Sequence, residues 1–504
     1  MDFYDELKKK GLLSILRHEE YEPPTMEGWP KVRDFLMDIV QNNRSVYIEG
    51  DYDVDGLCCT LTLLEGLKGL GVEEITVYEY RERTHAVDRV AIQQCIQKHC
   101  DYFIVADTGS NDLGLLQKLN RYGIKVIVLD HHITELRYDD FGDDIAIINT
   151  ELETERLELS AGALCFITMD LLYRELGKKS PQSLAAFAMV SLIADVIPMA
   201  NPLNRGLYYY AVEQDEAELP PQVLYFKGQY SRFNTRYVGY WFSPRVNACF
   251  RAEKFDVLNR LFFRKLNAME MNAAIEEVEE IYEASRNLVR LLSDLVENYA
   301  VTLEHFVFVD LYKVKEQFDV MEGKLYNYTG LIANKLSERF GKTGVVICSM
   351  ENYYKGSVRD QAGRDYLTIF KQLCFAGGHK AAFGIKVRQM ELQSFLEDLK
   401  FIDKHYAVNS IADEPIIITV PEGELPDEDM IHDMSIYNEF ASPGVPVVFL
   451  RKKMIGSLEE RRTEFYYKYK WGNLEIQNDT RIPYGRTVMI KPIQSWKLKL
   501  LVQS

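Results

Sequence analysis

The sequence predicts an α/β fold in which a parallel-sheet domain is followed by a long connecting helix, a smaller α/β domain and a small C-terminal β domain. Three observations predict this order. Strand and helix patterns alternate over residues 45–135, residues 267–298 form one long amphipathic helical pattern, and residues 405–504 are richer in proline and alternating strand patterns. A chain of 504 residues is long enough for about three domains.

The first module shows regular alternation along the chain. Strand patterns occupy residues 45–50, 73–80, 101–107 and 125–132, and helical patterns occupy residues 57–71, 87–99 and 111–123. This alternation predicts βαβ units, and the near-continuous apolar strands favour a mainly parallel sheet covered on both faces. Residues 183–199 are too long and alanine-rich for a strand and predict a buried helix. We therefore place the first domain at residues 1–205.

Three further regions follow the first domain. We expect a helical connector at residues 206–300, a second α/β domain at 301–404 and an OB-like β domain at 405–504. In the last region the segment "EFYYKYKWG" places Tyr466, Lys468 and Lys470 on one face of a strand. The opposite face carries Phe465, Tyr467, Tyr469 and Trp471. Aromatic and basic residues in this pattern are typical of a single-strand binding platform, or of a β core with solvated lysines.

Composition limits the classes of function. The formal net charge of −17 argues against non-specific coating of nucleic acid by the whole surface, and leaves room for bound divalent cations. No apolar stretch is long enough to span a membrane, and the charged N-terminal residues do not resemble a signal peptide. The eight cysteines form no C-x-x-C pair. We therefore expect a monomer in the reducing cytoplasm, without structural zinc or a disulfide framework.

The segment "DYDVDG" at residues 51–56 crowds three carboxylates into five positions. In an extended chain, side chains at i, i+2 and i+4 share one face, so Asp51, Asp53 and Asp55 could converge where the first strand ends. Three carboxylates this close repel one another unless they are solvated or surround a cation. The alternative interpretation is a solvated turn.

Other acids and histidines stand at corresponding places. Asp107 ends the third strand pattern, and Asp130, His131 and His132 end the fourth. Asp195 is an acid within an apolar stretch, where it needs a partner. Ligands of open α/β sheets bind outside the carboxyl ends of the strands. Alone, a D-x-D pattern is a turn in most sequences, "DHH" carries little weight, and Asp195 could cap a helix, but together the motifs predict a two-metal centre.

The chemistry of these ligands favours two Mn²⁺ or Mg²⁺ ions. Carboxylates suit both ions, and imidazole nitrogen favours Mn²⁺. Two such ions about 3.5–4 Å apart can activate a water molecule and stabilise both oxygens of an in-line phosphoryl displacement.

The same motifs carry a family resemblance. "DYDVDG", "VADTGS", "DHH" and "SLIADVIPM" resemble, in order, the four motifs of the DHH phosphoesterase superfamily. "PLNR", "FSPRVNACFR", "YTGLIANKLSERFGKTGVVI", "KGSVRD" and "AGGHKAAFG" are similar to segments of the RecJ-type nucleases, and the last three belong to their DHHA1 domain. The resemblance implies a DHH domain, a connecting helix, a DHHA1 domain and an OB-fold. It also implies 5′-to-3′ degradation of single-stranded DNA with Mn²⁺ or Mg²⁺.

The resemblance assigns roles to residues. The metal ligands would be Asp53, Asp55, Asp107, His131 and Asp195, with Asp51 as a further ligand or as a group just behind the ligands. Asp107 would bridge the two ions, Asp130 would orient a neighbouring group, and His132 would contact the scissile phosphate. Ser357 and Arg359 would hold the terminal 5′-phosphate, because arginine pairs bidentately with phosphate oxygens. The remaining substrate-binding residues would be Arg81, Arg245, Arg251, Gly377, Gly378 and His379.

The chain also departs from the family pattern. "THAV" replaces a Gly-Tyr-Gly turn after Arg81, which aims this arginine differently, and Phe250 replaces a glycine, which narrows the groove. The segment near residue 440 has only a faint counterpart in the family.

Alternative functions remain open. We expect an exonuclease on single-stranded nucleic acid, with DNA favoured and a single-strand-binding protein or a helicase as candidate protein partner. A phosphodiesterase of short oligonucleotides, such as nanoRNA or linear dinucleotides, is the first alternative, although such relatives usually lack a third domain. A non-catalytic replication scaffold is the second, but scaffolds lose metal ligands that are all present here. A soluble pyrophosphatase would not need the "GGH" or "GSVR" segments.

Overall fold

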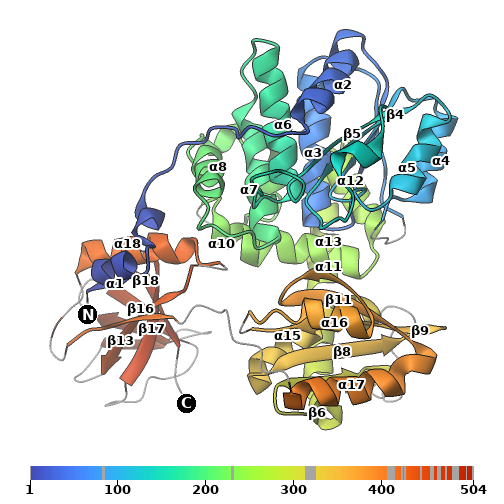
Figure 1. The fold of residues 1–504 in the computed structure, drawn as a ribbon. Coiled ribbons are helices and arrows are strands. Elements are labelled where there is room, and N and C mark those ends of the chain that lie inside the picture. The colour runs from blue at the N-terminus through green and yellow to red at the C-terminus, as the bar shows by residue number, and fades with distance from the viewer. Residues whose placement is uncertain are drawn as a thin grey trace.

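The computed structural model describes residues 2–501 with internal gaps, and contains three β-sheets joined by helices (Figure 1). The residues not described are 82–85, 229–231, 313–324, 362, 406–414, 422–423, 425–426, 443–444, 454–458, 463–466, 472–473, 479–486 and 495–496. The predicted α/β architecture is confirmed.

The first sheet is fully parallel and has the strand order β2-β1-β3-β4-β5. Its strands are β1 (Val46–Gly50), β2 (Ile75–Val77), β3 (Tyr102–Ala106), β4 (Lys125–Asp130) and β5 (Ile145–Asn149). The strand order reverses between β1 and β3, and ligands bind at such a switch point. Four strands were predicted from the sequence, and β5 was not.

Helices cover both faces of this sheet. Figure 1 shows α4 (Arg89–Gln97) and α5 (Leu113–Asn120) on one side, and α3 (Val54–Gly69), α6 (Ala161–Glu175) and α7 (Ala185–Ala194) on the other. The predicted buried helix corresponds to α7, which is followed by α8 (Pro202–Val212). The helix α2 (Trp29–Gln41) packs near β5. Every residue of β1, β3 and β5 is buried, which explains their continuous apolar sequences.

The connector is helical as predicted. It contains α9 (Pro221–Leu224), α10 (Thr235–Tyr237), the π-helical turn η5 (Val238–Phe242), α11 (Ser243–Arg251) and α12 (Phe255–Phe263). The long helix α13 spans Ala268–Val296. Asn267 caps it by accepting hydrogen bonds from the backbone of Met269 and Glu270, and the Glu270 side chain accepts a hydrogen bond from the Asn267 amide.

The second sheet has the order β10-β11-β9-β8-β7-β6, and within it only the β7–β8 pair is parallel. Its strands are β6 (Val301–Thr302), β7 (Phe306–Asp310), β8 (Thr343–Ser349), β9 (Tyr353–Arg359), β10 (Phe375–His379) and β11 (Ala382–Arg388). One apolar cluster joins this sheet to α13 and α15 (Thr329–Phe340). Another joins its opposite face to α16 (Leu367–Leu373) and α17 (Leu392–His405).

The C-terminal β domain has seven described strands in the order β12-β13-β17-β18-β16-β15-β14, two more than the five of an OB-fold. They are β12 (Ile416–Thr419), β13 (Val448–Lys453), β14 (Glu459–Arg462), β15 (Tyr467–Trp471), β16 (Leu474–Asn478), β17 (Thr487–Gln494) and β18 (Lys497–Leu501). Phe465 and Tyr466 lie outside the described residues, and the rest of the aromatic segment forms β15 with Lys470 exposed.

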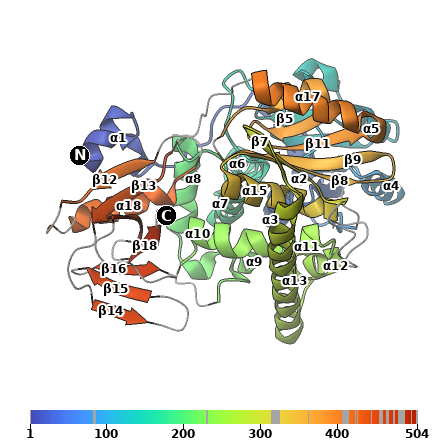
Figure 2. The same cartoon turned by 90° about the horizontal axis from the view of Figure 1, so that it is seen from below.

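The two chain ends meet in this domain. The N-terminal helix α1 (Phe3–Lys9) lies against α18 (Glu428–Glu439), as both views show (Figures 1 and 2). The rings of Phe3 and Tyr437 pack edge to face, 6.0 Å apart, and the Tyr4 hydroxyl donates to Asp433 at 2.8 Å. Residues 10–28 then lead from this domain to the first domain. Within the described residues, no helix is both long and apolar enough to cross a bilayer.

Candidate metal centre

The acidic segment after β1 is not extended throughout. The expectation that Asp51, Asp53 and Asp55 share one face of an extended segment was therefore wrong. The Asp53 side chain accepts hydrogen bonds from the amides of Asp55 (2.9 Å) and Gly56 (3.1 Å), and this N-cap starts α3. Asp55 therefore lies in the first helical turn. A Cβ atom at Gly56 would lie 2.3 Å from the Asp51 backbone nitrogen, so only glycine permits this tight turn.

Asp107 lies at the end of β3, at the centre of the acidic cluster. Its backbone has φ of +63° and its amide donates to the Leu129 carbonyl at 2.9 Å. Burial, together with the charges of Asp55, Asp53 and Asp195, raises the pKa of Asp107 well above its usual value. Among the described residues, its buried Oδ2 atom has no hydrogen-bond partner. An orphaned buried carboxylate oxygen among other acids is the environment that a cation would satisfy.

His131 presents its Nε2 nitrogen to the same cluster of acids. Its Nδ1 atom lies 3.2 Å from the Leu159 carbonyl, to which it donates, so Nε2 is left as the acceptor. Nε2 lies 3.2 Å from Asp107 Oδ1, 3.4 Å from Asp195 Oδ2 and 3.9 Å from Asp55 Oδ2. Metal-binding histidines are typically oriented by such a hydrogen bond from the other ring nitrogen.

Asp130 organises the histidine pair rather than joining the acidic cluster. It accepts hydrogen bonds from the backbone of His131 (2.8 Å), His132 (3.2 Å) and Ser110 (3.1 Å), and lies 2.8 Å from His132 Nδ1. Burial alone would raise the pKa of Asp130, but the hydrogen bond and charge of His132 hold it well below its usual value. Burial lowers the pKa of His132, but Asp130 outweighs it and raises this pKa to about 9.

Two further candidate ligands come from helix ends. The carboxylate of Asp55 accepts hydrogen bonds from the amides of Ala161 (3.0 Å) and Gly162 (2.8 Å) at the start of α6. Asp195 is the C-cap residue directly after α7, and 21% of its side chain is exposed. Burial, together with Asp55 and Asp53, raises the pKa of Asp195 well above its usual value. The acids are thus held together despite their mutual repulsion.

The structure brings together all the residues that the sequence predicts as metal ligands. Three overlapping groups each have ligand atoms within 4.8 Å of one another: Asp51, Asp53 and Asp107; Asp55, His131 and Asp195; and Asp107, His131 and His132. Asp107 belongs to two groups, as expected of a bridging ligand. The donor set of carboxylates and imidazole fits divalent cations such as Mn²⁺ and Mg²⁺.

The predicted phosphate-binding residues lie in the second domain. The Ser357 hydroxyl is 2.8 Å from that of Thr329, at the start of α15. Among the described residues, Arg359 donates only to carbonyls, at Val358 (2.8 Å) and Phe383 (3.3 Å). Burial lowers the pKa of Arg359 to about 10, so it stays cationic at neutral pH. A Cβ at Gly330 would lie 2.9 Å from Arg359 Nη2, so this glycine leaves room beside the guanidinium.

The glycine motif lies beside these residues in the sheet. Gly377 pairs with Gly384, and Gly384 pairs with Ser357 on the next strand. Gly378 has φ of +129°, and a Cβ there would lie 2.9 Å from Phe383 Cα, so it requires glycine. His379 ends β10 in the row of Arg359, and its side chain lies outside the described part of the structure.

The other predicted arginines differ in their surroundings. Arg245 is buried, pairs with Glu279 and lies over the Tyr282 ring at 4.6 Å. Arg81 is exposed and precedes undescribed residues 82–85, which include Thr84 and His85 of the "THAV" segment. Phe250 is buried against Tyr80, with ring centroids 4.9 Å apart. Arg245 thus has partners within the connector, and its substrate role stays a prediction.

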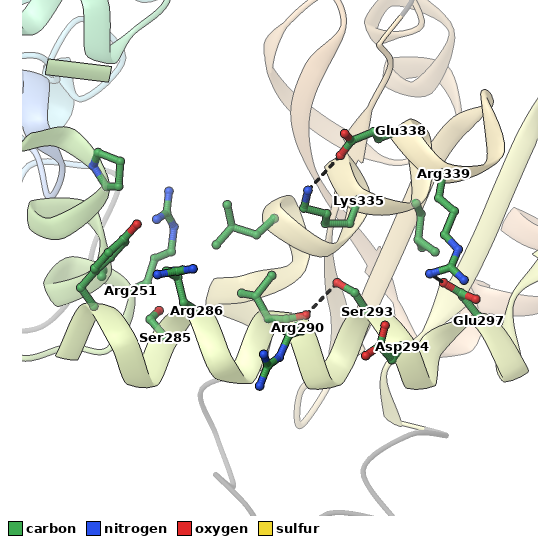
Figure 3. Close-up of a pocket in the computed structure, with 16 residues that line it drawn as sticks. Arg251, Ser285, Arg286, Arg290, Ser293, Asp294, Glu297, Lys335, Glu338 and Arg339 are labelled. Atoms are coloured by element: carbon green, nitrogen blue, oxygen red, sulfur yellow. Dashed lines mark hydrogen bonds and ion pairs between the residues drawn. The ribbon is translucent and has the colours of Figure 1, made fainter. Parts of the chain in front are cut away.

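Arg251 opens onto a cavity of about 660 Å³ between α11, α13 and α15 (Figure 3). Its backbone carbonyl accepts a hydrogen bond from Asn327 Nδ2 at 3.0 Å, which joins α11 to the second domain. Several cations of the cavity have acidic partners: Lys335 pairs with Glu338 at 2.9 Å, Arg339 with Glu297, and Arg286 with Glu283 at 2.9 Å. The lining of this cavity between the connector and the second domain carries five cationic side chains and three acidic ones.

Comparisons with known proteins agree with this geometry. Residues 45–192 match the DHH family, N-terminal domain. The single-stranded-DNA-specific exonuclease RecJ of Bacillus subtilis is 22% identical over 410 residues, covering 79% of this chain and 50% of that protein. RecJ of Thermus thermophilus is 26% identical over 281 residues, covering 53% of this chain and 40% of that protein. The matches thus span half or less of the length of these two relatives.

A solved structure shows the same fold over nearly the whole chain. The crystal structure of RecJ in complex with Mn²⁺ from Thermus thermophilus has a TM-score of 0.75 at 17% identity, covering 98% of this chain and 74% of that chain. Residues 45–192 therefore form a domain similar to the DHH family. The chain as a whole is similar to RecJ in fold, and distantly similar to it in sequence.

Proposed function

We propose that this protein is an exonuclease that hydrolyses phosphodiester bonds of single-stranded DNA from the 5′ end with two divalent cations. One observation carries the proposal. In a chain similar to RecJ, a cluster of acids surrounds an Asp107 oxygen that has no hydrogen-bond partner among the described residues, and a separate cationic site lies at Arg359. The curated relatives reported above are named as single-stranded-DNA-specific exonucleases.

The acidic residues would hold the cations in two sets. Asp51 and Asp53 form one set, Asp55, His131 and Asp195 form the other, and Asp107 lies between them. Bound Mn²⁺ or Mg²⁺ ions supply a nucleophilic water and stabilise the oxygens of the displacement. The His131 nitrogen favours Mn²⁺ over Mg²⁺.

His132 is suited to contact the scissile phosphate. Asp130 fixes its Nδ1 atom, and 46% of the His132 side chain is exposed. The hydrogen bond and charge of Asp130 raise the pKa of His132, which favours the cationic form whose other nitrogen can donate to a phosphate oxygen. Asp130 remains ionised and keeps the imidazole in place.

Ser357 and Arg359 are suited to take the terminal 5′-phosphate. Among the described residues, the Arg359 guanidinium donates to two backbone carbonyls and forms no ion pair with a carboxylate. Ser357 adds a hydroxyl beside it. Both lie at the N-terminus of α15, where backbone amides favour an anion. A terminal phosphate held here would fix which bond reaches the acidic centre.

The test is cleavage of 5′-labelled and 3′-labelled single-stranded DNA and RNA of two lengths with Mn²⁺. We expect products from the 5′ end of DNA, and none after chelation of the metal. Asp107→Ala should reduce cleavage to a few per cent or less without lowering the melting temperature, because it removes one of several repelling acids. Asp143→Ala, a change of an exposed acid in the same domain, is the matched control. Full activity of Asp107→Ala would refute the two-metal mechanism.

We extend the proposal to the organisation of the chain. The three sheets and α13 support domains at residues 1–205, 206–300, 301–404 and 405–504. A monomer in the cytoplasm, with a single-strand-binding protein or a helicase as partner, fits an exonuclease of this type. Size-exclusion chromatography with light scattering tests the oligomeric state.

A further inference from the structure

The loop that follows the metal ligand Asp195 has an unusual start. Val196 adopts φ of +55°, a left-handed conformation that is rare for a β-branched residue. The amides of Val196 and Ile197 donate to the carbonyls of Ile193 (3.3 Å) and Leu192 (2.9 Å), a helix ending that normally uses glycine. Because such strain persists only where the surroundings impose it, the contacts of residues 196–201 determine where Asp195 lies.

The first contacts come from α8. The guanidinium of Arg205, which is completely buried, donates from Nη1 to the carbonyls of Met199 (2.9 Å) and Ala200 (2.7 Å). The neighbouring Asn204 donates from Nδ2 to the Pro198 carbonyl at 2.9 Å. These contacts fix the backbone of the loop from inside the first domain.

Asn204 also connects this loop to the other side of the metal centre. Its Nδ2 atom donates to the Glu158 carbonyl at 2.9 Å. The next residue, Leu159, is the one whose carbonyl orients His131. The loop after Asp195 and the segment behind His131 are thus held by the same side chain.

The second contact comes from the N-terminal segment. Arg205 Nη2 pairs with Glu19 at 2.9 Å and donates to the Ser14 carbonyl at 3.4 Å. This segment continues from α1, where Phe3 is buried against Tyr437 of the C-terminal domain. The buried arginine therefore links the loop to a part of the chain anchored on the C-terminal domain.

The third contact comes from the C-terminal domain directly. The Met199 amide donates to the Ser442 hydroxyl at 2.9 Å, and this hydroxyl donates to the Phe440 carbonyl at 3.0 Å. The Phe440 ring packs against Tyr208 and Tyr209 of α8, with centroids 5.0 and 5.8 Å away. Ser442 is thus held rigidly against the loop.

We propose that Ser442 and the Glu19–Arg205 pair are positioning residues for Asp195, through which the C-terminal domain and the N-terminal segment support cation binding at Asp55, His131 and Asp195. This inference rests on the proposed function, because it requires a metal centre. None of the three residues touches the cation. They act by fixing the Met199 backbone and, through it, the turn at Val196.

The test is Mn²⁺ binding to the metal-free full-length chain, measured by titration calorimetry, with melting temperature measured in parallel. Ser442→Ala should weaken binding at one site by roughly 10-fold, since residues behind metal ligands typically contribute 10–100-fold. Ser442→Thr keeps the hydroxyl and should restore affinity. Glu19→Gln should weaken binding in the same direction.

Ser435→Ala is the matched control. Ser435 lies on α18 of the same domain, and its hydroxyl also donates to a backbone carbonyl, that of His432 at 2.7 Å. This variant should bind Mn²⁺ like the unaltered chain. Unchanged Mn²⁺ affinity in Ser442→Ala would overturn the inference even if the melting temperature falls, because the contact would then only stabilise the fold. Failure of the unaltered chain to bind Mn²⁺ would overturn the metal centre itself, and this inference with it.

Discussion

The second α/β domain and the C-terminal β domain are attached to the first domain in different ways. The C-terminal domain shares one continuous apolar cluster with it, which includes Phe3, Tyr437 and Phe440. The second domain has one apolar cluster of its own and shares a second with Leu292 and Val296 of the connecting helix α13. Figures 1 and 2 show the two domains on different sides of the molecule.

The contacts of the second domain with α11 are mainly polar. Asn327 Nδ2 donates to the Arg251 carbonyl at 3.0 Å and lies 3.2 Å from Glu253, and the Tyr326 hydroxyl donates to Glu253 at 3.3 Å. Interfaces of this kind permit relative domain motion, whereas a shared apolar core does not. The difference indicates that the first and the C-terminal domains form one body, and that the second domain, joined through α13 and these polar contacts, is the part better able to move.

Among the changes that test this comparison, truncation after residue 404 should have the largest effect, a loss of stability. It would expose Phe3 and Leu7, which are fully buried, and remove the Phe440 ring from Tyr208. Loss of one large buried side chain costs about 3–5 kcal/mol, so a loss of several contacts should lower the melting temperature by about 10 °C or more. Circular dichroism melting curves measure this. A truncated chain that melts like the full chain would show that the C-terminal domain is an independent appendage.

Arg359→Ala should affect substrate recognition but not stability, because Arg359 lies in the independently packed second domain. Hydrogen bonds to charged groups contribute about 1.5–3 kcal/mol, so cleavage of a 5′-phosphorylated strand should slow by roughly 10–100-fold. Cleavage of the unphosphorylated strand should not change. Arg388→Ala, on the same sheet and paired with Glu391 at 3.4 Å, is the control. If Arg359→Ala still prefers phosphorylated ends, the phosphate site lies elsewhere.

The sequence predicts those features that have a local pattern. Continuous apolar strands reveal the sheet, the acid at a strand end identifies Asp107, and the acid within an apolar stretch identifies Asp195. The strand β5 was missed because the next helix, α6, begins only at Ala161, so no helix follows it closely enough to complete the alternating pattern. The position of Asp55 within a helix was missed because the side chain of Asp53, rather than any periodicity, decides where α3 begins.

Contacts between residues far apart in the chain could not be predicted, because they leave no local pattern in the sequence. The backbone carbonyl of Leu159 orients His131. Because every residue has a backbone carbonyl, no residue type in the sequence marks this contact. Ser442 and Glu19 reach the loop after Asp195 from opposite ends of the chain, and neither lies in a recognisable motif. Thr329 lies beside Ser357, and Gly330 beside Arg359, only because α15 packs across β9.

The smallest effect should come from the polar seam between α11 and the second domain. Asn327→Ala removes the hydrogen bond to the Arg251 carbonyl, and one such bond contributes about 0.5–1.5 kcal/mol. If this contact sets where the second domain presents the strand, KM for a phosphorylated strand should rise roughly 2- to 10-fold, with kcat and melting temperature nearly unchanged. Gln393→Ala is the matched control: it removes one amide hydrogen bond, to Glu397 at 3.0 Å, on the exposed face of α17 in the same domain and away from the seam. A fall in melting temperature at constant KM would mean that the seam only stabilises the fold, and that the second domain is as fixed as the C-terminal one.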